Sequence, residues 1–243
     1  MNDLKKLTQI TLLAIITLFI SYESIQSMRA NAWYFNALNT LKQPRALITP
    51  QELNLANDAI TLATQLEPLQ AHYWQLSAYI KMLRLTEKNV NRSNVPKVYK
   101  QAELALLNSL KYRQSWAETW IELAKIVSYQ EGPSERVFGY VQQAKKAGPY
   151  KIDVHLGVIE IALINWHQLP PKYKALYVSE LKLLAKHGYK FPLVFDIAKQ
   201  TDALPILCMS LQFGNDFEKI RGSFIFEQHC KSRRVYTSSL HIK

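Results

Sequence analysis

The chain has 243 residues, a formal net charge of +11, seven glycines and two cysteines. Glycine at about 3% lies well under the usual ~7%, and no Asn-Gly or Asp-Gly pair marks a hairpin turn. This composition, rich in Ala, Leu and Lys, argues against a β-rich fold and predicts an all-α chain.

The first 22 residues combine charge and hydrophobicity as a membrane-inserting segment does. Lys5 and Lys6 precede an uncharged run, 7–22, whose centre reads LLAIITLFI. The positive-inside rule then leaves 1–6 as a cytoplasmic tip and sends the bulk of the chain across the membrane. We therefore expect a single-pass protein of the bacterial inner membrane with most of its residues in the periplasm.

The sequence leaves open whether this segment is cleaved. A helix of 16 residues covers about 24 Å, which is short for a hydrocarbon core of about 30 Å, although local thinning and the long lysine side chains can close the gap. Ala30-Asn31-Ala32 has the small-x-small form of a signal-peptidase site, but Glu23 and Arg29 lie between it and the apolar run. We favour an uncleaved transmembrane anchor over a cleaved signal.

The segment 23–48 is expected to be a helical linker. Neither glycine nor proline interrupts it before Pro44, and apolar residues recur at steps of three and four: Ile25, Met28, Ala32 and Phe35.

Residues 49–190 have the pattern of paired antiparallel helices. Thr49-Pro50-Gln51-Glu52 and Ser115-Trp116-Ala117-Glu118 both have the form of a capping box at a helix start. The polar stretch 86–95 breaks the helical pattern, and we interpret it as a loop or insertion. Proline and glycine mark the other helix ends: Pro68, Gly132-Pro133, Gly148-Pro149, Pro170-Pro171 and Gly188.

These helices have the spacing of tetratricopeptide repeats. The best copy runs from Ala117 through Trp120 and Leu123-Ala124 to Pro149, and a second copy surrounds Leu66-Glu67-Pro68 and Trp74. Leu123-Ala124 to Leu156-Gly157 is a step of 33, and Trp74 to Trp120 is 46, which fits one repeat plus the insertion. We expect small residues to let the two helices of a pair approach, and tryptophans to fill the space between pairs. A tetratricopeptide-like stack is predicted, with another all-α arrangement as the alternative.

The positive charge is concentrated in one segment. Between Leu69 and Ser115 there are eight basic and two acidic residues, so this segment alone carries +6. Beyond the membrane the available polyanions are lipid head groups and acidic polysaccharide rather than nucleic acid. A solvated helix face is the plainer interpretation. The candidate polyanion-binding residues are Lys81, Arg84, Arg92 and Lys97.

Residues 191–243 match no repeat and hold both cysteines. In an oxidising compartment Cys208 and Cys230 are expected to form a disulfide that pins a C-terminal cap, with free thiols as the alternative. His229 beside Cys230 lacks the ligand spacing of a zinc module. We expect the basic, polar end, 232–243, to be disordered.

No catalytic motif is present in the sequence. It contains no glycine-rich phosphate loop, no Gly-x-Ser-x-Gly and no His-Glu-x-x-His, and its histidines are scattered. His155 and His167 are interpreted as packing or surface residues. Glu118 and Glu122 share a helix face, but a glycosidase needs two carboxyl groups across a cleft. We expect neither enzymatic activity nor a cofactor or metal.

An anchor, a degenerate tetratricopeptide-like body and a two-cysteine tail together resemble the VpsP-type proteins. The residues that carry the resemblance are Leu66-Glu67-Pro68, Ala117 to Ala124, and Cys208 with Cys230. VpsP-type proteins are accessory proteins of bacterial exopolysaccharide and biofilm-matrix gene clusters. The resemblance implies a non-catalytic scaffold in polysaccharide assembly or export, whose partners are proteins of that machinery. An envelope scaffold of another pathway, such as cytochrome maturation or cell division, is the alternative.

Overall fold

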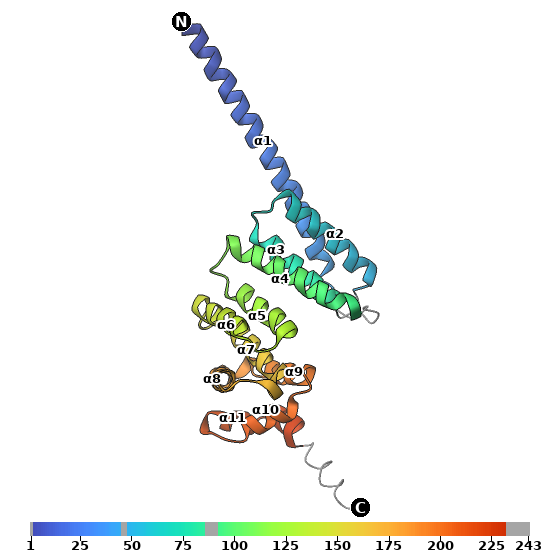
Figure 1. Ribbon diagram of the computed structural model, residues 1–243, viewed down its shortest axis with the longest axis vertical. Coiled ribbons are helices and arrows are strands. Elements are labelled where there is room, and N and C mark those ends of the chain that lie inside the picture. Colours follow the sequence, from blue (N-terminus) through green and yellow to red (C-terminus); the bar gives the residue numbers. More distant parts are fainter. Residues whose placement is uncertain (1, 45–47, 86–91, 232–243) are drawn as a thin grey trace, which may run out of the picture. The chain divides into compact units, whose positions relative to one another are not determined.

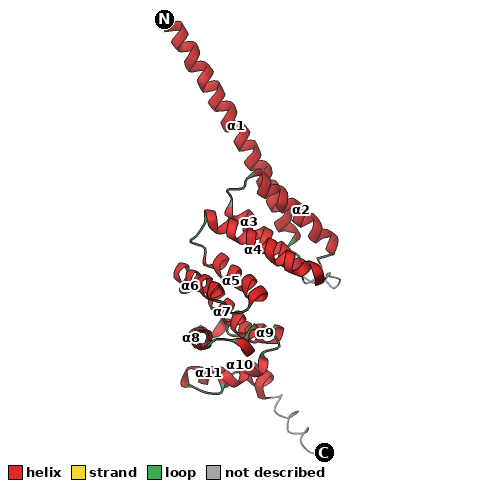
Figure 2. Ribbon diagram, in the orientation of Figure 1, coloured by secondary structure: helices red, strands yellow, loops and turns green. Residues whose placement is uncertain are grey.

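The computed structural model describes residues 2–44, 48–85 and 92–231, and every regular element in these ranges is helical (Figures 1 and 2). The chain divides into two compact units, 1–113 and 114–243. The division falls inside the segment 49–190 that the sequence presents as one array, so each unit is described by itself. Of the predicted loop 86–95, the structure describes 92–95, where a 3₁₀ turn (Arg92–Asn94) leads into a helix that begins at Val95. Residues 86–91 and the C-terminal 232–243 lie outside the described residues.

The first unit consists of two helical hairpins. Helix α1 (Asn2–Thr40) pairs with α2 (Pro50–Leu66), and α3 (Ala71–Arg84) pairs with α4 (Val95–Tyr112), which follows a 3₁₀ turn, η2 (Arg92–Asn94). The helix start predicted at Thr49 is confirmed: the Thr49 hydroxyl accepts from the Glu52 N–H, and the Glu52 carboxylate accepts from the Thr49 N–H at 2.8 Å.

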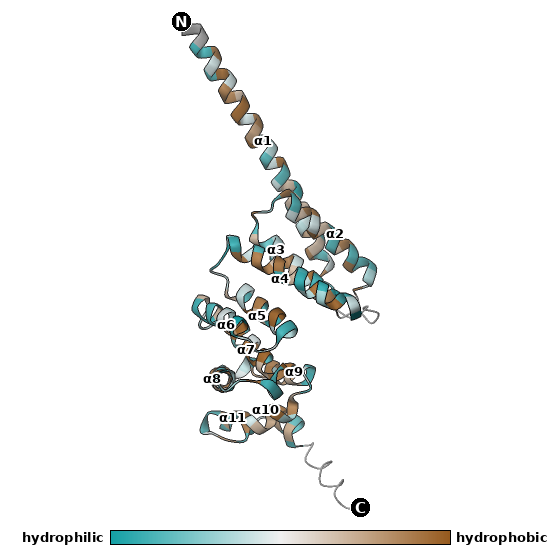
Figure 3. Cartoon of the chain, in the orientation of Figure 1, coloured by the Kyte–Doolittle hydropathy of each residue, from teal (hydrophilic) through white to brown (hydrophobic). Residues whose placement is uncertain are grey.

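Helix α1 belongs to both the apolar N-terminal segment and the first hairpin. The stretch Lys5–Thr40 is long and apolar enough to cross a membrane (Figure 3), and none of its most apolar 18-residue window is buried. Further along the same helix, Ala30 and Ala37 are fully buried against α2 and α3. The segment expected to be a linker is thus half of a packed hairpin as far as Thr40.

The face by which α1 packs is opposite to the one that sequence periodicity suggests. Ile25, Met28 and Phe35 are each more than half exposed, whereas Ala30 and Ala37 are buried. Two polar contacts fix this orientation: Ser27 donates to Glu67 at 3.1 Å, and the Tyr73 hydroxyl donates to Asn31 at 2.9 Å. Alanine occupies the packed face because its small side chain lets two helix backbones approach closely.

The second unit continues the hairpin pattern. Its pairs are α5 (Ala117–Glu131) with α6 (Glu135–Ala147), α7 (Ile152–Ile164) with α8 (Pro171–Lys186), and α9 (Pro192–Gln200) with α10 (Leu204–Leu211). The first helices of successive pairs, α5, α7 and α9, pack against one another. Short elements complete the unit: η3 (Trp166–Gln168), η4 (Gly188–Lys190), η5 (Asn215–Phe217), α11 (Glu218–Arg221), α12 (Phe224–Phe226) and the π-helical η6 (Glu227–Lys231).

One turn geometry recurs three times between hairpins. The residues that follow α2, α4 and α6 have nearly the same φ and ψ: −139° and 76° at Glu67, −150° and 76° at Arg113, and −149° and 73° at Gly148. Each donates its N–H to the carbonyl four residues earlier. The intervals are 46 and 35 residues. The repeat is therefore present in the backbone, with a step of 35 residues between the second and third turns.

Two tryptophans of the repeat copies stabilise these turns. Trp74 donates its indole N–H to the Pro68 carbonyl at 2.7 Å, and Trp120 donates to Gln114 at 2.8 Å, each six residues upstream. Trp120 also lies against Tyr140 of its own hairpin. His155 occupies the equivalent position after the third turn.

The helix start expected at Ser115 is wrong in its detail. Helix α5 begins at Ala117, and its N-cap residue is Trp116, which makes no side-chain capping bond. The recurrent turn sets this start, because it places Ser115 inside the turn, one position too early to cap. Glu118, expected to close the capping box, instead forms an ion pair with Lys151 at 2.7 Å.

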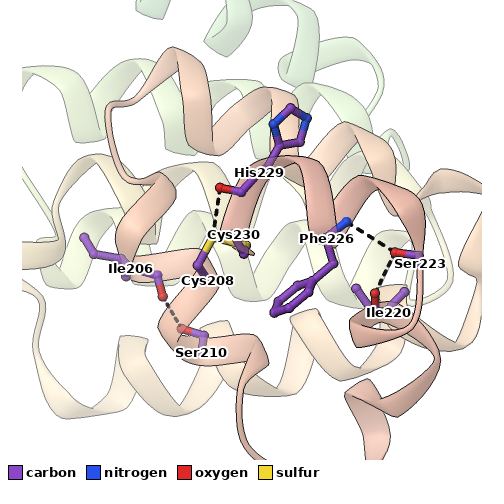
Figure 4. Close-up of a disulfide and its surroundings, with 8 residues drawn as sticks. All are labelled: Ile206, Cys208, Ser210, Ile220, Ser223, Phe226, His229 and Cys230. Carbon is purple, nitrogen blue, oxygen red and sulfur yellow. Dashed lines mark hydrogen bonds between the residues drawn. A yellow bond between two sulfur atoms is a disulfide. The ribbon is translucent and has the colours of Figure 1, made fainter. Parts of the chain in front are cut away.

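A disulfide joins Cys208 of α10 to Cys230 of η6, as Figure 4 shows, with a Cα–Cα distance of 5.4 Å and a sequence separation of 22. Closing a loop of that length lowers the conformational entropy of the unfolded chain, which stabilises the folded state by about 3 kcal/mol. Apolar side chains accompany it, with Leu207, Leu211 and Phe226 buried around the bridge. The segment expected to be a cap thus contains one more hairpin, α9/α10, and a tail that is tied back to it.

Candidate functional site

A solvent-open hollow of about 350 Å³ lies on the face that the first helices of three successive hairpins form. In stacked helical repeats this kind of face carries the extended binding surface. The hollow is lined from α5, α7, α9 and the residues after α9: Tyr129, Glu160, Ile164, Ile197, Gln200, Thr201 and Asp202.

A hydrogen-bonded network holds the polar wall of the hollow in place. Tyr129 donates its hydroxyl to Glu160 at 2.6 Å, and Lys125 bridges Glu160 at 3.0 Å and Glu122 at 3.1 Å. Burial alone would lower the pKa of Lys125, but the two carboxylates outweigh burial and raise it. Both carboxylate oxygens of Glu160 are therefore held in place by side chains of α5.

The rim of the hollow contains an unusual backbone conformation. Asp202 has φ +53°, in the left-handed region, and it is the one non-glycine residue with positive φ in the described ranges. Thr201 donates its hydroxyl to the Ile197 carbonyl at 2.9 Å, which fixes the end of α9 beside it. This conformation ends the helix α9: the Ala203 N–H donates to the Ala198 carbonyl at 2.8 Å, the bond of a helix end with a left-handed residue after it.

The four predicted polyanion-binding residues lie at one end of the hairpin α3/α4. The Ser109 hydroxyl donates to the Ala71 carbonyl, so the end of α4 lies beside the start of α3 and the pair is antiparallel. Arg84 at the end of α3, Arg92 in η2 and Lys97 at the start of α4 must then share the opposite end. Arg92 and Lys97 are exposed.

Lys81 differs from the other three. It is half-buried and donates its ammonium group to the Ser77 hydroxyl at 2.8 Å. Burial, together with the neighbouring charge of Arg84, lowers the pKa of Lys81. We therefore call Arg84, Arg92 and Lys97 the basic end of the hairpin. Lys81 is left out of this group because it is half-buried and bonded within α3.

A second polar cluster is buried and structural. Glu180 of α8 is fully buried and accepts from His155 of α7 and from Lys145 of α6. Burial alone would raise the pKa of Glu180, but the hydrogen bonds from His155 and Lys145 and the lysine charge outweigh burial and hold it below its usual range. The cluster joins three helices and touches neither the hollow nor solvent at its centre. His167, the other histidine considered in the sequence, is exposed in η3.

Sequence reasoning missed both the hollow and the buried cluster. Tyr129, Glu160 and Asp202 are far apart in the sequence and belong to no motif, so only the stacking of the first helices brings them together. A signal for His155 does exist: it falls at the position that tryptophan occupies after the two earlier turns. Within residues 2–44, 48–85 and 92–231, no group of three or more His, Cys, Asp or Glu side chains could hold a metal ion. Neither a protein-family model nor a curated protein matches this sequence.

Proposed function

We propose that this chain is a non-catalytic scaffold of the bacterial inner membrane that serves exopolysaccharide biosynthesis or export. In this proposal α1 anchors the chain, and the hollow across α5, α7 and α9 binds a segment of a partner protein of that machinery. The observation that carries the proposal is the polar hollow on the first-helix face of three stacked hairpins. The layout that resembles the VpsP-type proteins supplies the pathway.

Two features of the fold support an uncleaved anchor with the bulk of the chain in the periplasm. The small-x-small site Ala30-Asn31-Ala32 lies inside α1, where Ala30 is buried and Asn31 accepts from Tyr73. Cleavage after Ala32 would remove both contacts from the first hairpin. The Cys208–Cys230 disulfide belongs to proteins of oxidising compartments, in agreement with the positive-inside rule.

Filling the hollow should abolish partner binding. Gln200 is exposed at the lip, so Gln200→Trp places an indole in the hollow without entering the core. Affinity capture from gently solubilised membranes, with a C-terminal tag and mass spectrometry, should recover polysaccharide polymerase, export or glycosyltransferase components with the wild type. We expect at least tenfold lower recovery with Gln200→Trp, or about 1.4 kcal/mol.

The matched control is Gln143→Trp, the same change at an exposed position of α6, a second helix of its hairpin. This variant should recover partners as well as the wild type. If Gln200→Trp retains every partner, the hollow is not the docking site. Recovery of haem-handling or division proteins instead would favour the alternative, an envelope scaffold of another pathway.

The distance of the basic end from the membrane favours acidic polysaccharide over lipid head groups as its ligand. The Ser27–Glu67 contact marks the end of the hairpins nearest the apolar run, and α3 runs away from that end for 14 residues, about 21 Å. With a Debye length of about 8 Å at physiological salt, the basic end is screened from the head groups of the anchoring membrane. An acidic polysaccharide is therefore the better ligand for it.

Charge reversal at the basic end should weaken binding to acidic polysaccharide. For the triple variant Arg84→Glu, Arg92→Glu and Lys97→Glu we expect several-fold weaker retention on an immobilised polyuronate at low salt and a shallower salt dependence. The control reverses three exposed lysines of the second unit, Lys146, Lys186 and Lys219, and so changes the net charge equally. Equal weakening in both triples would show that only the overall charge matters.

A further inference from the structure

The exposed stripe on α1 beyond the apolar run has no covering element within the described residues. Ile25 is 54% exposed, Met28 68% and Phe35 53%, and Ala32 between them is exposed as well. These four, which we call the α1 seam, lie on the side of the helix opposite the buried Ala30 and Ala37. Their steps of three, four and three residues are those of a coiled-coil seam.

Lipid cannot cover the α1 seam along its whole length. Phe35 is 13 residues past Tyr22, the last residue of the apolar run, which places it about 20 Å further along the helix axis. The interfacial layer of a bilayer adds only about 5 to 8 Å beyond the hydrocarbon core on each side. The seam therefore rises out of the membrane and needs a protein surface to cover it.

The register of the seam continues into the membrane. The same alternation of three and four steps, carried toward the N-terminus, falls on Ser21, Leu18 and Ala14. Small residues at such positions let two helices approach closely inside a bilayer. Ser21 and Ala14 thus leave room on the seam side of α1 for a second membrane-spanning helix.

From these observations we propose that the α1 seam binds the α1 seam of a second copy of this chain, in a parallel two-stranded coiled coil that starts in the membrane and ends near Phe35. This inference rests on the uncleaved anchor of the proposed function. Two copies inserted in one orientation present the same residues at the same height, so each seam residue meets its own counterpart across a two-fold axis.

Charge and area agree with a second copy as the occupant. Between residues 24 and 41 Arg29 is the one charged residue, and its guanidinium donates to Gln26, which lies on the packed side of the helix. Burying a large apolar side chain removes on the order of 100 Å² from water, so three of them on each helix cover on the order of 600 Å² outside the membrane. Within the membrane, Ala14, Leu18 and Ser21 extend the same contact, where close helix packing rather than removal of area from water holds the helices together.

Cysteine cross-linking of the full-length chain in membranes tests the proposal. Both native cysteines are already joined to each other. Met28→Cys and Phe35→Cys should therefore form a disulfide-linked dimer under mild oxidation, seen on a non-reducing gel. Gln26→Cys, which lies between Ile25 and Met28 in height but on the half-buried, packed side of α1, is the control. We expect on the order of tenfold more dimer from the two seam cysteines than from this control.

A second measurement covers the case in which the cysteines perturb packing. The molar mass of the protein in detergent micelles, by light scattering, should be that of a dimer for the wild type and of a monomer for the pair Met28→Glu and Phe35→Glu. The pair Leu55→Glu and Leu69→Glu, at sites of similar exposure off the seam, should leave a dimer.

The outcomes separate this inference from the proposed function. A full-length, membrane-bound monomer with no more cross-linking at the seam than at Gln26 overturns the dimer and leaves the anchor in place. A shortened soluble chain that begins near Trp33 overturns the anchor and the dimer together.

Discussion

Glu180→Gln should destabilise the second unit by about 4 kcal/mol, because it leaves a buried histidine and a lysine without their carboxylate. Removing one partner of a buried charge pair typically costs 3 to 5 kcal/mol. Glu180 is fully buried and His155 is 2% exposed, so water cannot replace the lost partner, while Lys145 at 30% keeps part of its hydration. Urea unfolding of the full chain, followed by circular dichroism at 222 nm, measures the loss.

The matched control is Glu135→Gln. Glu135 also pairs with a lysine, Lys172, but its side chain is 86% exposed. Exposed pairs contribute little, so we expect a change within about 0.5 kcal/mol. A similar loss in both variants would show that burial of the Glu180 cluster does not matter.

Glu180 should also make the free energy of unfolding depend on pH, in a direction that its pKa fixes. The pKa of Glu180 in the folded state lies below its ordinary value. Its stabilising contribution is therefore complete above the unfolded-state pKa of about 4.3 and is lost as the pH falls toward the lower folded-state value. The difference in unfolding free energy between wild type and Glu180→Gln should be constant near neutral pH and shrink below about pH 4. A difference that stays constant down to pH 3 would contradict this assignment.

Gly157→Leu should lower the free energy of unfolding at least as much as Glu180→Gln does, because a larger side chain at this position collides with a neighbouring helix. A Cβ atom on Gly157 would lie 2.3 Å from Cγ1 of Ile121, a side chain of α5 that is itself 1% exposed. Neither helix can yield without moving the packed first helices α5 and α7 apart. Overpacking costs about 1 to 3 kcal/mol for a few added carbons and more where the neighbours cannot move, so we expect about 4 kcal/mol. Chemical denaturation of the full chain measures it.

The control for Gly157 lies one helix earlier. Gly139 of α6 is exposed, and a Cβ there would meet nothing within 4 Å. Gly139→Leu should therefore stabilise the protein by up to about 1 kcal/mol, since leucine is the better helix former. The two substitutions are identical in chemistry and opposite in expected sign. If both stabilise, α5 and α7 do not approach as closely as described.

Gly157 also shows where the sequence prediction stopped short. The sequence indicates that a small residue belongs in this helix, but the expectation that it allows the two helices of one pair to approach is wrong. Gly157 faces α5, the first helix of the preceding pair, rather than its own partner α8. A periodic pattern identifies a crowded position, whereas the neighbour that crowds it depends on how the hairpins stack.

In helix α1, too, the sequence pattern predicts the element but not which of its faces is buried. The spacing of Ile25, Met28, Ala32 and Phe35 predicts a continuous helix, and this is confirmed. That periodicity would equally suggest the packed face, yet these residues are exposed, because alanines on the other side allow closer contact with α2 and α3.

What the sequence by itself determined is local. It predicted the paired helices between residues 49 and 190 and many of their ends, because proline, glycine and the Thr49 capping box act on residues next to them in the chain. It also predicted one apolar helix at the N-terminus, since length and hydrophobicity are additive along a segment. The tertiary structure alone decided which residues meet. The hollow around Glu160, the buried Glu180 cluster and the basic end join side chains from different helices, and the free energy of such contacts depends on distances that no sequence spacing fixes.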